Sequence, residues 1–345
     1  MRRIVVFCSF CIPTDTNCMS DSEKLPRASL AYENHGFLNG PEGRILRMNA
    51  EYLEPLARFR RERIQDTVVF FGSARFVNLE TAQEGLAAAE REAMGPSPVK
   101  LLDTSYSAHL APPEEQPDGG GNGGEDRVKR ARAAVEMARY YEDARRLAYM
   151  LTEWALTIRS KRSRFVVTSG GGPGIMEAAN RGASEAGGKT IGLNIKLPFE
   201  QFPNRWITPA LNFEFHYFFM RKYWFAYLAK ALMVFPGGFG TLDEAFEILT
   251  LTQMKKLAKK MPVIIYGREY WHRIINFQAL VDAGAISAKD LNLYQWADTP
   301  EEAFGYLKAH LQDQIGTQSP RSLRPGGHFE DGGDGGGPEI SGTND

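Results

Sequence analysis

The stretch ALMVFPGGFGTLDEAFE, residues 231–247, contains the transition that decides the fold. Its apolar run ends at Phe235, three glycines follow, and then come Thr241 and two acids. This order predicts a buried strand over 231–235, a tight turn, and a helix over 241–258. Glycine lets a ligand approach the backbone closely, so the turn is a candidate binding loop.

The same order of elements recurs along the chain. Further apolar strands are predicted over 67–71, 164–169, 190–195 and 262–266. Helices are predicted over 42–64, 79–93, 126–161, 174–187, 216–230, 269–282 and 300–312, and Pro55 is expected to kink or divide the first of them. Apolar strands that alternate with helices indicate the α/β class, with a doubly wound parallel sheet and helices on both faces. In such sheets ligands bind beyond the carboxyl ends of the strands.

Changes in composition divide the chain. Residues 1–65 are predicted to be an N-terminal extension that is partly helical, with 1–41 poorly ordered, and residues 66–312 to be the main domain. The Gly- and Pro-rich segment 95–125 is predicted to be a mobile insertion in that domain. The tail 313–345, rich in Gly, Ser and Pro, is expected to be disordered.

Composition and charge exclude several classes of function. The 345 residues carry a formal net charge of -1, which argues against a general nucleic-acid or membrane-surface binder. No apolar run reaches the ~18 residues that span a bilayer. The opening MRRIVVFCSFCIP resembles a weak signal peptide without a cleavage site, so we expect a cytoplasmic protein. Cys8 and Cys11 form a CxxC that lacks a second ligand pair, so we interpret them, with Cys18, as thiols of a cytosolic protein.

Three predicted strands end in glycines. The first ends at Gly72 and Ser73, the second at Gly170, Gly171 and Gly172, and the third at Gly237, Gly238 and Gly240. A helix that begins at such a loop offers free N–H groups and the positive end of its dipole, which suits a phosphate. Thr241 adds a hydroxyl, either as the N-cap or as a direct phosphate donor. A tight turn explains any one loop, but three loops at corresponding strand ends favour an anion site.

Two nucleotide motifs fit poorly. The dinucleotide pattern GxGxxG fails in GGGPGIME, where Glu177 stands near the position of the third glycine, so we do not expect NAD. The segment ASEAGGKT, residues 183–190, matches a loosened P-loop, but it closes a helix and opens a strand, the reverse of the required context. We interpret its glycines as a helix C-cap. No metal-ligand motif such as HExxH occurs, and we expect no cofactor and no metal.

Charged residues flank the third loop. Asp243 and Glu244 fall in the first turn of the predicted helix, where acids complement the dipole. Beside a phosphate they need a balancing cation, which Arg221 and Lys222 can supply from helix 216–230. The arginine would hold the phosphate or a ribose, and the carboxylate would stabilise an oxocarbenium-like centre or position water. A plain surface ion pair is the alternative.

At these residues the sequence resembles the Lonely guy family, long mislabelled as lysine decarboxylases. MRK at 220–222 followed by PGGFGTLDE at 236–244 resembles the family signature, and FFGSAR and SGGGPGIMEAANRGA occupy the family's other loop positions. The resemblance runs from about 66 to 285 and implies a Rossmann-like, homodimeric or larger phosphoribohydrolase of nucleoside 5′-monophosphates. It implies Arg221 and Glu244 as the catalytic pair, Glu177 as a ribose contact, and phosphate contacts from Gly237, Gly238, Gly240 and Thr241.

The sequence also departs from the compact plant-type members. It reads TLDE where they often have two glutamates, and GIMEAANRG in place of their shorter GLMG form. We therefore favour AMP over cytokinin riboside monophosphates as the substrate. A nucleotide or phosphorylated-cofactor carrier without turnover is the alternative from a different class, because fold does not fix function.

Overall fold

The computed structural model describes residues 27–94, 123–198, 202–256 and 261–316. The chain divides into two compact units, Met1–Asn49 and Ala50–Asp345. The described part of the first unit holds a 3₁₀ turn, η2 (Ala31–Glu33), and a short helix, α1 (His35–Asn39), which the sequence pattern did not predict. The cysteines lie outside the described residues, as do 95–122 of the predicted insertion and 317–345 of the tail.

The second unit is built on a seven-stranded sheet in the order β4-β3-β2-β1-β5-β6-β7. All of its pairings are parallel, which confirms the predicted fold class. The strands are β1 (Thr67–Phe71), β2 (Val166–Ser169), β3 (Thr190–Ile195), β4 (Asn212–Phe215), β5 (Ala229–Val234), β6 (Val263–Tyr266) and β7 (Tyr294–Ala297).

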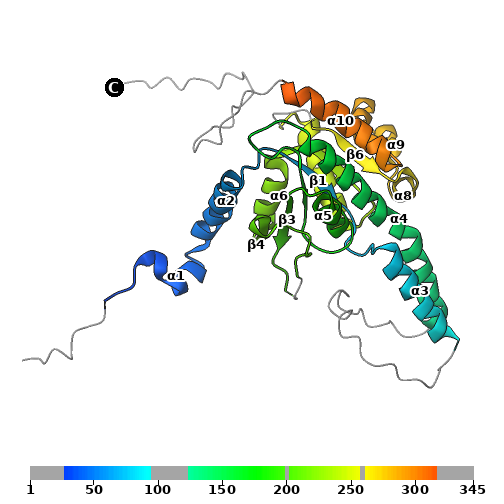
Figure 1. Cartoon of the computed structure of the whole chain (residues 1–345), viewed down its shortest axis with the longest axis horizontal. Helices are drawn as coiled ribbons and strands as arrows, with labels where there is room; N and C mark the ends of the chain where they lie inside the picture. The colour runs from blue at the N-terminus through cyan, green and yellow to red at the C-terminus, as the bar shows by residue number, and fades with distance from the viewer. Residues whose placement is uncertain (1–26, 95–122, 199–201, 257–260, 317–345) are drawn as a thin grey trace, which may run out of the picture. The chain divides into compact units, whose positions relative to one another are not determined.

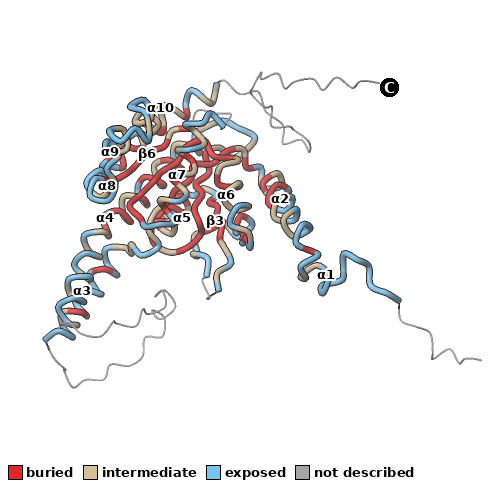
Figure 2. The backbone as a smooth tube through the Cα atoms, turned by 180° about the vertical axis from the view of Figure 1, so that it is seen from behind, coloured by how far each residue is buried: buried red, intermediate tan, exposed pale blue. Residues whose placement is uncertain are grey.

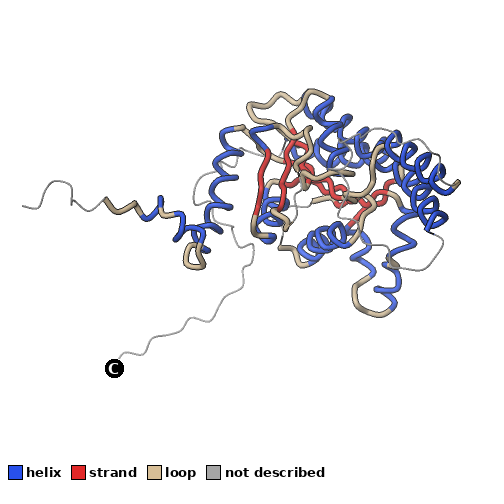
Figure 3. Tube along the Cα trace, turned by 90° about the horizontal axis from the view of Figure 1, so that it is seen from below, coloured by secondary structure: helices blue, strands red, loops and turns tan. Residues whose placement is uncertain are grey.

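Helices cover both faces of this sheet (Figures 1 and 3). One apolar cluster joins the sheet to α4 (Gly123–Leu156), α5 (Ile175–Glu185) and α10 (Pro300–Gly316). A second cluster joins the other face to α2 (Arg44–Arg61), α6 (Phe218–Tyr227), α7 (Phe239–Gln253) and α8 (Arg268–Ile274). Figure 2 shows the buried positions concentrated along the strands between these layers.

Further helices complete the described part of the second unit. Helix α3 (Leu79–Ala93) packs against α4, and α9 (Phe277–Asp282) follows α8. The 3₁₀ turns η4 (Pro209–Leu211) and η5 (Ala288–Leu293) precede β4 and β7. Within the described part of the chain, no helix combines the length and the hydropathy needed to cross a bilayer.

The order of the strands reverses between β1 and β5. From β1 the chain builds β2, β3 and β4 on one side, and it then returns to place β5, β6 and β7 on the other. Ligands of doubly wound sheets bind in the crevice outside such a reversal. Here the amide of Ser73 donates to the carbonyl of Pro236 at 3.0 Å, so the loops after β1 and β5 meet at this point.

Several predicted elements need correction. Helix α2 continues through Pro55 and is not divided. The helix predicted over 269–282 is two helices, because Ile275 is extended and the Asn276 side chain caps α9. Strands β4 and β7 were missed. The predicted C-cap is confirmed: Gly187 has a φ of +80°, and the amide of Gly188 donates to the carbonyl of Ala183 at 3.1 Å.

Candidate active site

The third glycine loop opens directly into α7. The N-cap is Gly238, which provides no side-chain hydrogen bond, so the prediction of Thr241 as N-cap is wrong. Thr241 lies three residues further on and is buried, with its hydroxyl oxygen 2.2 Å from where a Cβ on Gly237 would stand. Gly238 and Gly240 are exposed, and added Cβ atoms there would meet nothing within 4 Å. The backbone at these two glycines is therefore accessible at the start of α7, as an anion site at a helix N-terminus requires.

Ser73 connects the three loops. Besides its bond to Pro236, its carbonyl accepts the amide of Ile175, the first residue of α5, at 3.0 Å. A Cβ on Gly72 would stand 2.6 Å from Ile175, so only glycine permits this approach. The predicted loops after β1, β2 and β5 are therefore brought together in space.

The second glycine loop, after β2, is held by positive φ angles and by a side chain from a distant segment. Gly171 and Gly174 adopt φ of +78° and +71°, and Gly174 caps α5 without a side-chain bond. The Asn204 side chain donates to the carbonyls of Gly171 at 3.0 Å and Gly172 at 3.1 Å. The remaining predicted residue of this loop, Gly170, packs against Met176. Asn204 was missed because its segment carries no periodic pattern.

Arg221 and Glu244 form an ion pair. The guanidinium Nη2 lies 2.8 Å from the Glu244 Oε1, and each side chain is 13% exposed. The guanidinium also lies beside the rings of Phe218 and Phe225, at 5.3 Å and 5.4 Å from their centroids. Such a pair is mostly removed from water, so the alternative of a solvated surface pair does not describe it.

Burial raises the pKa of Glu244 to about 7. Arg221 and Lys222 act against this rise, and Asp243 adds to it. A carboxyl group that titrates near neutral pH can exist in either protonation state under working conditions, which suits acid–base chemistry.

Lys222 faces different carboxylates. Its Nζ lies 2.7 Å from Asp243 and 2.9 Å from Glu247. Burial lowers the pKa of Lys222, but hydrogen bonds to these two acids outweigh burial and leave it raised. Lys222 thus neutralises the charge of Asp243, and Arg221 pairs with Glu244.

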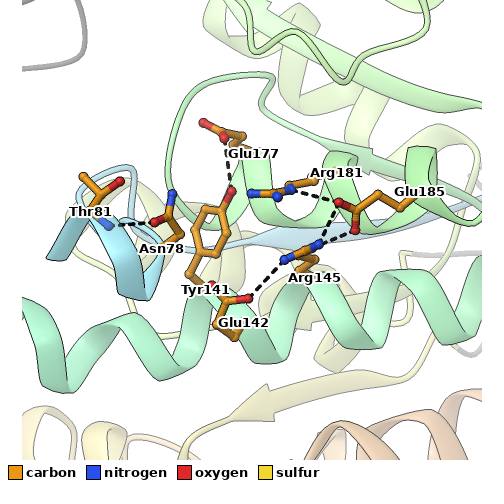
Figure 4. A network of polar contacts seen from close by, with 8 residues as sticks. All are labelled: Asn78, Thr81, Tyr141, Glu142, Arg145, Glu177, Arg181 and Glu185. Carbon is orange, nitrogen blue, oxygen red and sulfur yellow. Dashed lines mark hydrogen bonds and ion pairs between the residues drawn. The ribbon is translucent and has the colours of Figure 1, made fainter. Parts of the chain in front are cut away.

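Glu177 belongs to a network between α4 and α5 (Figure 4). The Tyr141 hydroxyl donates to Glu177 Oε1 at 3.1 Å, and burial, followed by the charge of Glu177, raises the pKa of this tyrosine. In the same network Arg145 holds Glu185 with two bonds, at 2.7 Å and 2.8 Å. Among the described residues, Glu177 bonds to Tyr141 and not to the Arg221–Glu244 pair.

Comparison with known families supports the motifs. Residues 176–307 match the family model described as "Possible lysine decarboxylase". This match fits the resemblance to the Lonely guy family that the sequence motifs indicate. The matched segment contains Glu177, Arg221 and Glu244, and the match supports a nucleotide-related role at the level of the family.

Solved structures match about half of this chain at low sequence identity. The molybdenum cofactor carrier protein of Chlamydomonas reinhardtii is 20% identical, with a TM-score of 0.34, over 50% of this chain and 89% of that one. The X-ray structure of TM1055 is 24% identical, with a TM-score of 0.37, over 50% and 89%. No curated protein matches the chain.

Proposed function

We propose that the protein hydrolyses the N-glycosidic bond of AMP-like nucleoside 5′-monophosphates to a free base and ribose 5-phosphate. The observation that carries this proposal is the largely buried ion pair of Arg221 and Glu244 on helices α6 and α7, close to the open N-terminus of α7. An anion site and a carboxyl group of raised pKa on the same short helix suit a phosphosugar whose C1′ becomes positive in the transition state.

The glycine loops and Glu177 bind the substrate in this proposal. Gly237, Gly238, Gly240 and Thr241 bind the 5′-phosphate through the first turn of α7, and Gly72, Ser73 and Gly170–Gly172 close the crevice from the neighbouring strands. Glu177 accepts ribose hydroxyls at the start of α5, and Lys222 offsets the negative charge of Asp243 near the phosphosugar.

Glu244 acts in its ionised form. Its carboxylate stabilises the charge that builds at C1′ and orients the attacking water, while Arg221 holds the phosphosugar and supports the carboxylate. No step needs a metal or an organic cofactor.

The experiment incubates the purified protein with a panel of nucleoside monophosphates, including AMP and cytokinin riboside monophosphates, and measures free base. Glu244→Gln should abolish adenine release while AMP binding is retained. Asp243→Asn is the matched control, because Asp243 is the adjacent acid on α7 and pairs with Lys222 instead of Arg221. Turnover that survives in Glu244→Gln would remove Glu244 from the reaction, and wild-type binding without release would favour a carrier.

We infer also that two copies of the chain pair over α6 and α7. Phe218 and Phe219 on α6 are each 53% exposed, and Phe239 at the start of α7 is 92% exposed. Aromatic side chains exposed together beside a site are a common mark of an interface. Light scattering should give a dimer for the wild type and a monomer for Phe239→Ser; a monomeric wild type would contradict the pairing.

A further inference from the structure

Helix α2 lies outside the family-matched segment, yet it contacts the start of α6, the helix that carries Arg221. The carboxylate of Glu51 accepts the amide of His216 at 2.7 Å and the amide of Tyr217 at 3.2 Å. Tyr217 is the N-cap of α6 and supplies no side-chain cap of its own. Glu51 therefore holds the two residues that lead into α6, and its negative charge suits the positive end of the α6 dipole.

Pro55 supplies a second link between the two helices. Proline has no N–H, so the carbonyl of Glu51, four residues earlier, has no donor within α2. The indole Nε1 of Trp224 donates to this carbonyl at 2.9 Å. The ring of Tyr52 lies 5.9 Å from that of Trp224. Both the side chain and the backbone of Glu51 are thus bonded to α6, one at its start and one in its second turn.

A short series of contacts connects Glu51 with the Arg221–Glu244 pair. The Tyr217 carbonyl accepts the amide of Arg221 at 3.2 Å, and the Arg221 guanidinium pairs with Glu244 at 2.8 Å. The Nε of Arg221 is buried without a hydrogen-bond partner in the described part of the chain. The orientation of the guanidinium consequently depends on Glu244, on the rings of Phe218 and Phe225 beside it, and on where α6 begins.

We propose that Glu51 is a positioning residue for the reaction: it fixes the first turn of α6 and, through it, the distance between Arg221 and Glu244. This inference rests on the proposed function of that pair. The competing interpretation is that Glu51 only stabilises the packing of α2.

The sign of a pKa change separates the two interpretations. The charged groups that face Glu244 are Arg221 and Lys222 on α6 and Asp243 on α7. If Arg221 moves away after a substitution at Glu51, its stabilisation of the Glu244 carboxylate weakens and the pKa of Glu244 rises. Loss of the Glu51 charge by itself acts in the opposite direction, because removing a negative charge lowers the pKa of a carboxyl group.

The test uses the full chain with Glu51→Ala and Glu51→Gln. Glu54→Gln is the control, since Glu54 lies on the same helix and contacts Arg58 instead of α6. We expect Glu51→Ala to reduce kcat/KM for adenine release about tenfold, a usual effect of losing a charge-assisted contact that orients a reacting group. The control should keep wild-type activity. Glu51→Gln keeps one acceptor and should reduce kcat/KM less than Glu51→Ala. If the alanine variant does not fold, the glutamine variant tests the positioning role of Glu51.

A second readout does not require turnover. NMR titration of ¹³C-labelled glutamate side chains, with Glu244 assigned by its loss in Glu244→Gln, should show a higher pKa of Glu244 in Glu51→Ala. An unchanged or lowered pKa, together with unchanged kcat/KM and a reduced Tm, would overturn the positioning role. A wild-type protein that releases no base would instead contradict the proposed function, and the titration would still decide the role of Glu51.

Discussion

Arg221 and Glu244 stand 23 positions apart on different helices, and their side chains meet at 2.8 Å. One lies at the start of α6, just before β5, and the other in the first turns of α7, just after it. Strand β5 thus follows the helix that carries Arg221 and precedes the glycine loop at Gly237–Gly240. This local arrangement brings a cation, a carboxyl group of raised pKa and an exposed glycine loop to one region.

The pH dependence of activity should follow Glu244. Burial sets its pKa at about 7, and the proposed role needs the ionised form. Since the carboxyl is protonated below that value, kcat/KM for AMP should rise with pH through about 7 and level off above about 8. Initial rates of adenine release between pH 5.5 and 8.5 measure this. A profile that is flat across that range would contradict the role of Glu244.

Gly237→Ala should distort the glycine loop after β5. The added Cβ would stand 2.2 Å from the Thr241 Oγ1 and 3.0 Å from the Ser73 amide, so the loop has to shift. Overpacking of this kind costs about 1–3 kcal/mol. We expect a lower Tm and weaker AMP binding by calorimetry. Gly238→Ala, where the Cβ meets nothing within 4 Å, should keep the wild-type Tm. Equal Tm values for the two variants would refute this account of the loop.

Asp66→Asn should destabilise the opposite end of the sheet. Asp66 is fully buried, pairs with the buried Arg164 at 2.8 Å, and accepts the amide of Phe165 at 2.7 Å. The amide keeps the shape but leaves the guanidinium without its counter-charge, which costs about 3–5 kcal/mol. Urea unfolding measures the loss. The control Glu269→Gln, from an exposed pair with Arg139, should change stability by less than about 1 kcal/mol. A comparable change in both variants would contradict the argument.

The parts of the fold and site that could be predicted from the sequence are the local ones. The loop after β5 was recognisable because its glycines and acids stand within a few residues of an apolar strand. Strands β4 and β7 were not predicted because neither forms an apolar run. Both are edge strands whose residues alternate between buried and more exposed, as in the sequence NFEF.

Contacts between distant segments could not be predicted. Asn204 reaches Gly171 across 33 positions, and the amide of Ser73 finds Pro236 only when β1 and β5 pair. Pro55 predicted a kink or a break in isolation, and its actual consequence depends on Trp224 being close enough to bond the freed carbonyl. Such relationships follow from tertiary packing, which no local pattern records.

The products formed from AMP test the central claim most directly. Wild-type protein incubated with AMP should yield adenine and ribose 5-phosphate in equal amounts, quantified by chromatography, and Glu244→Gln should yield neither. AMP that binds to the wild-type protein and is recovered intact would contradict the claim that this site cleaves the N-glycosidic bond.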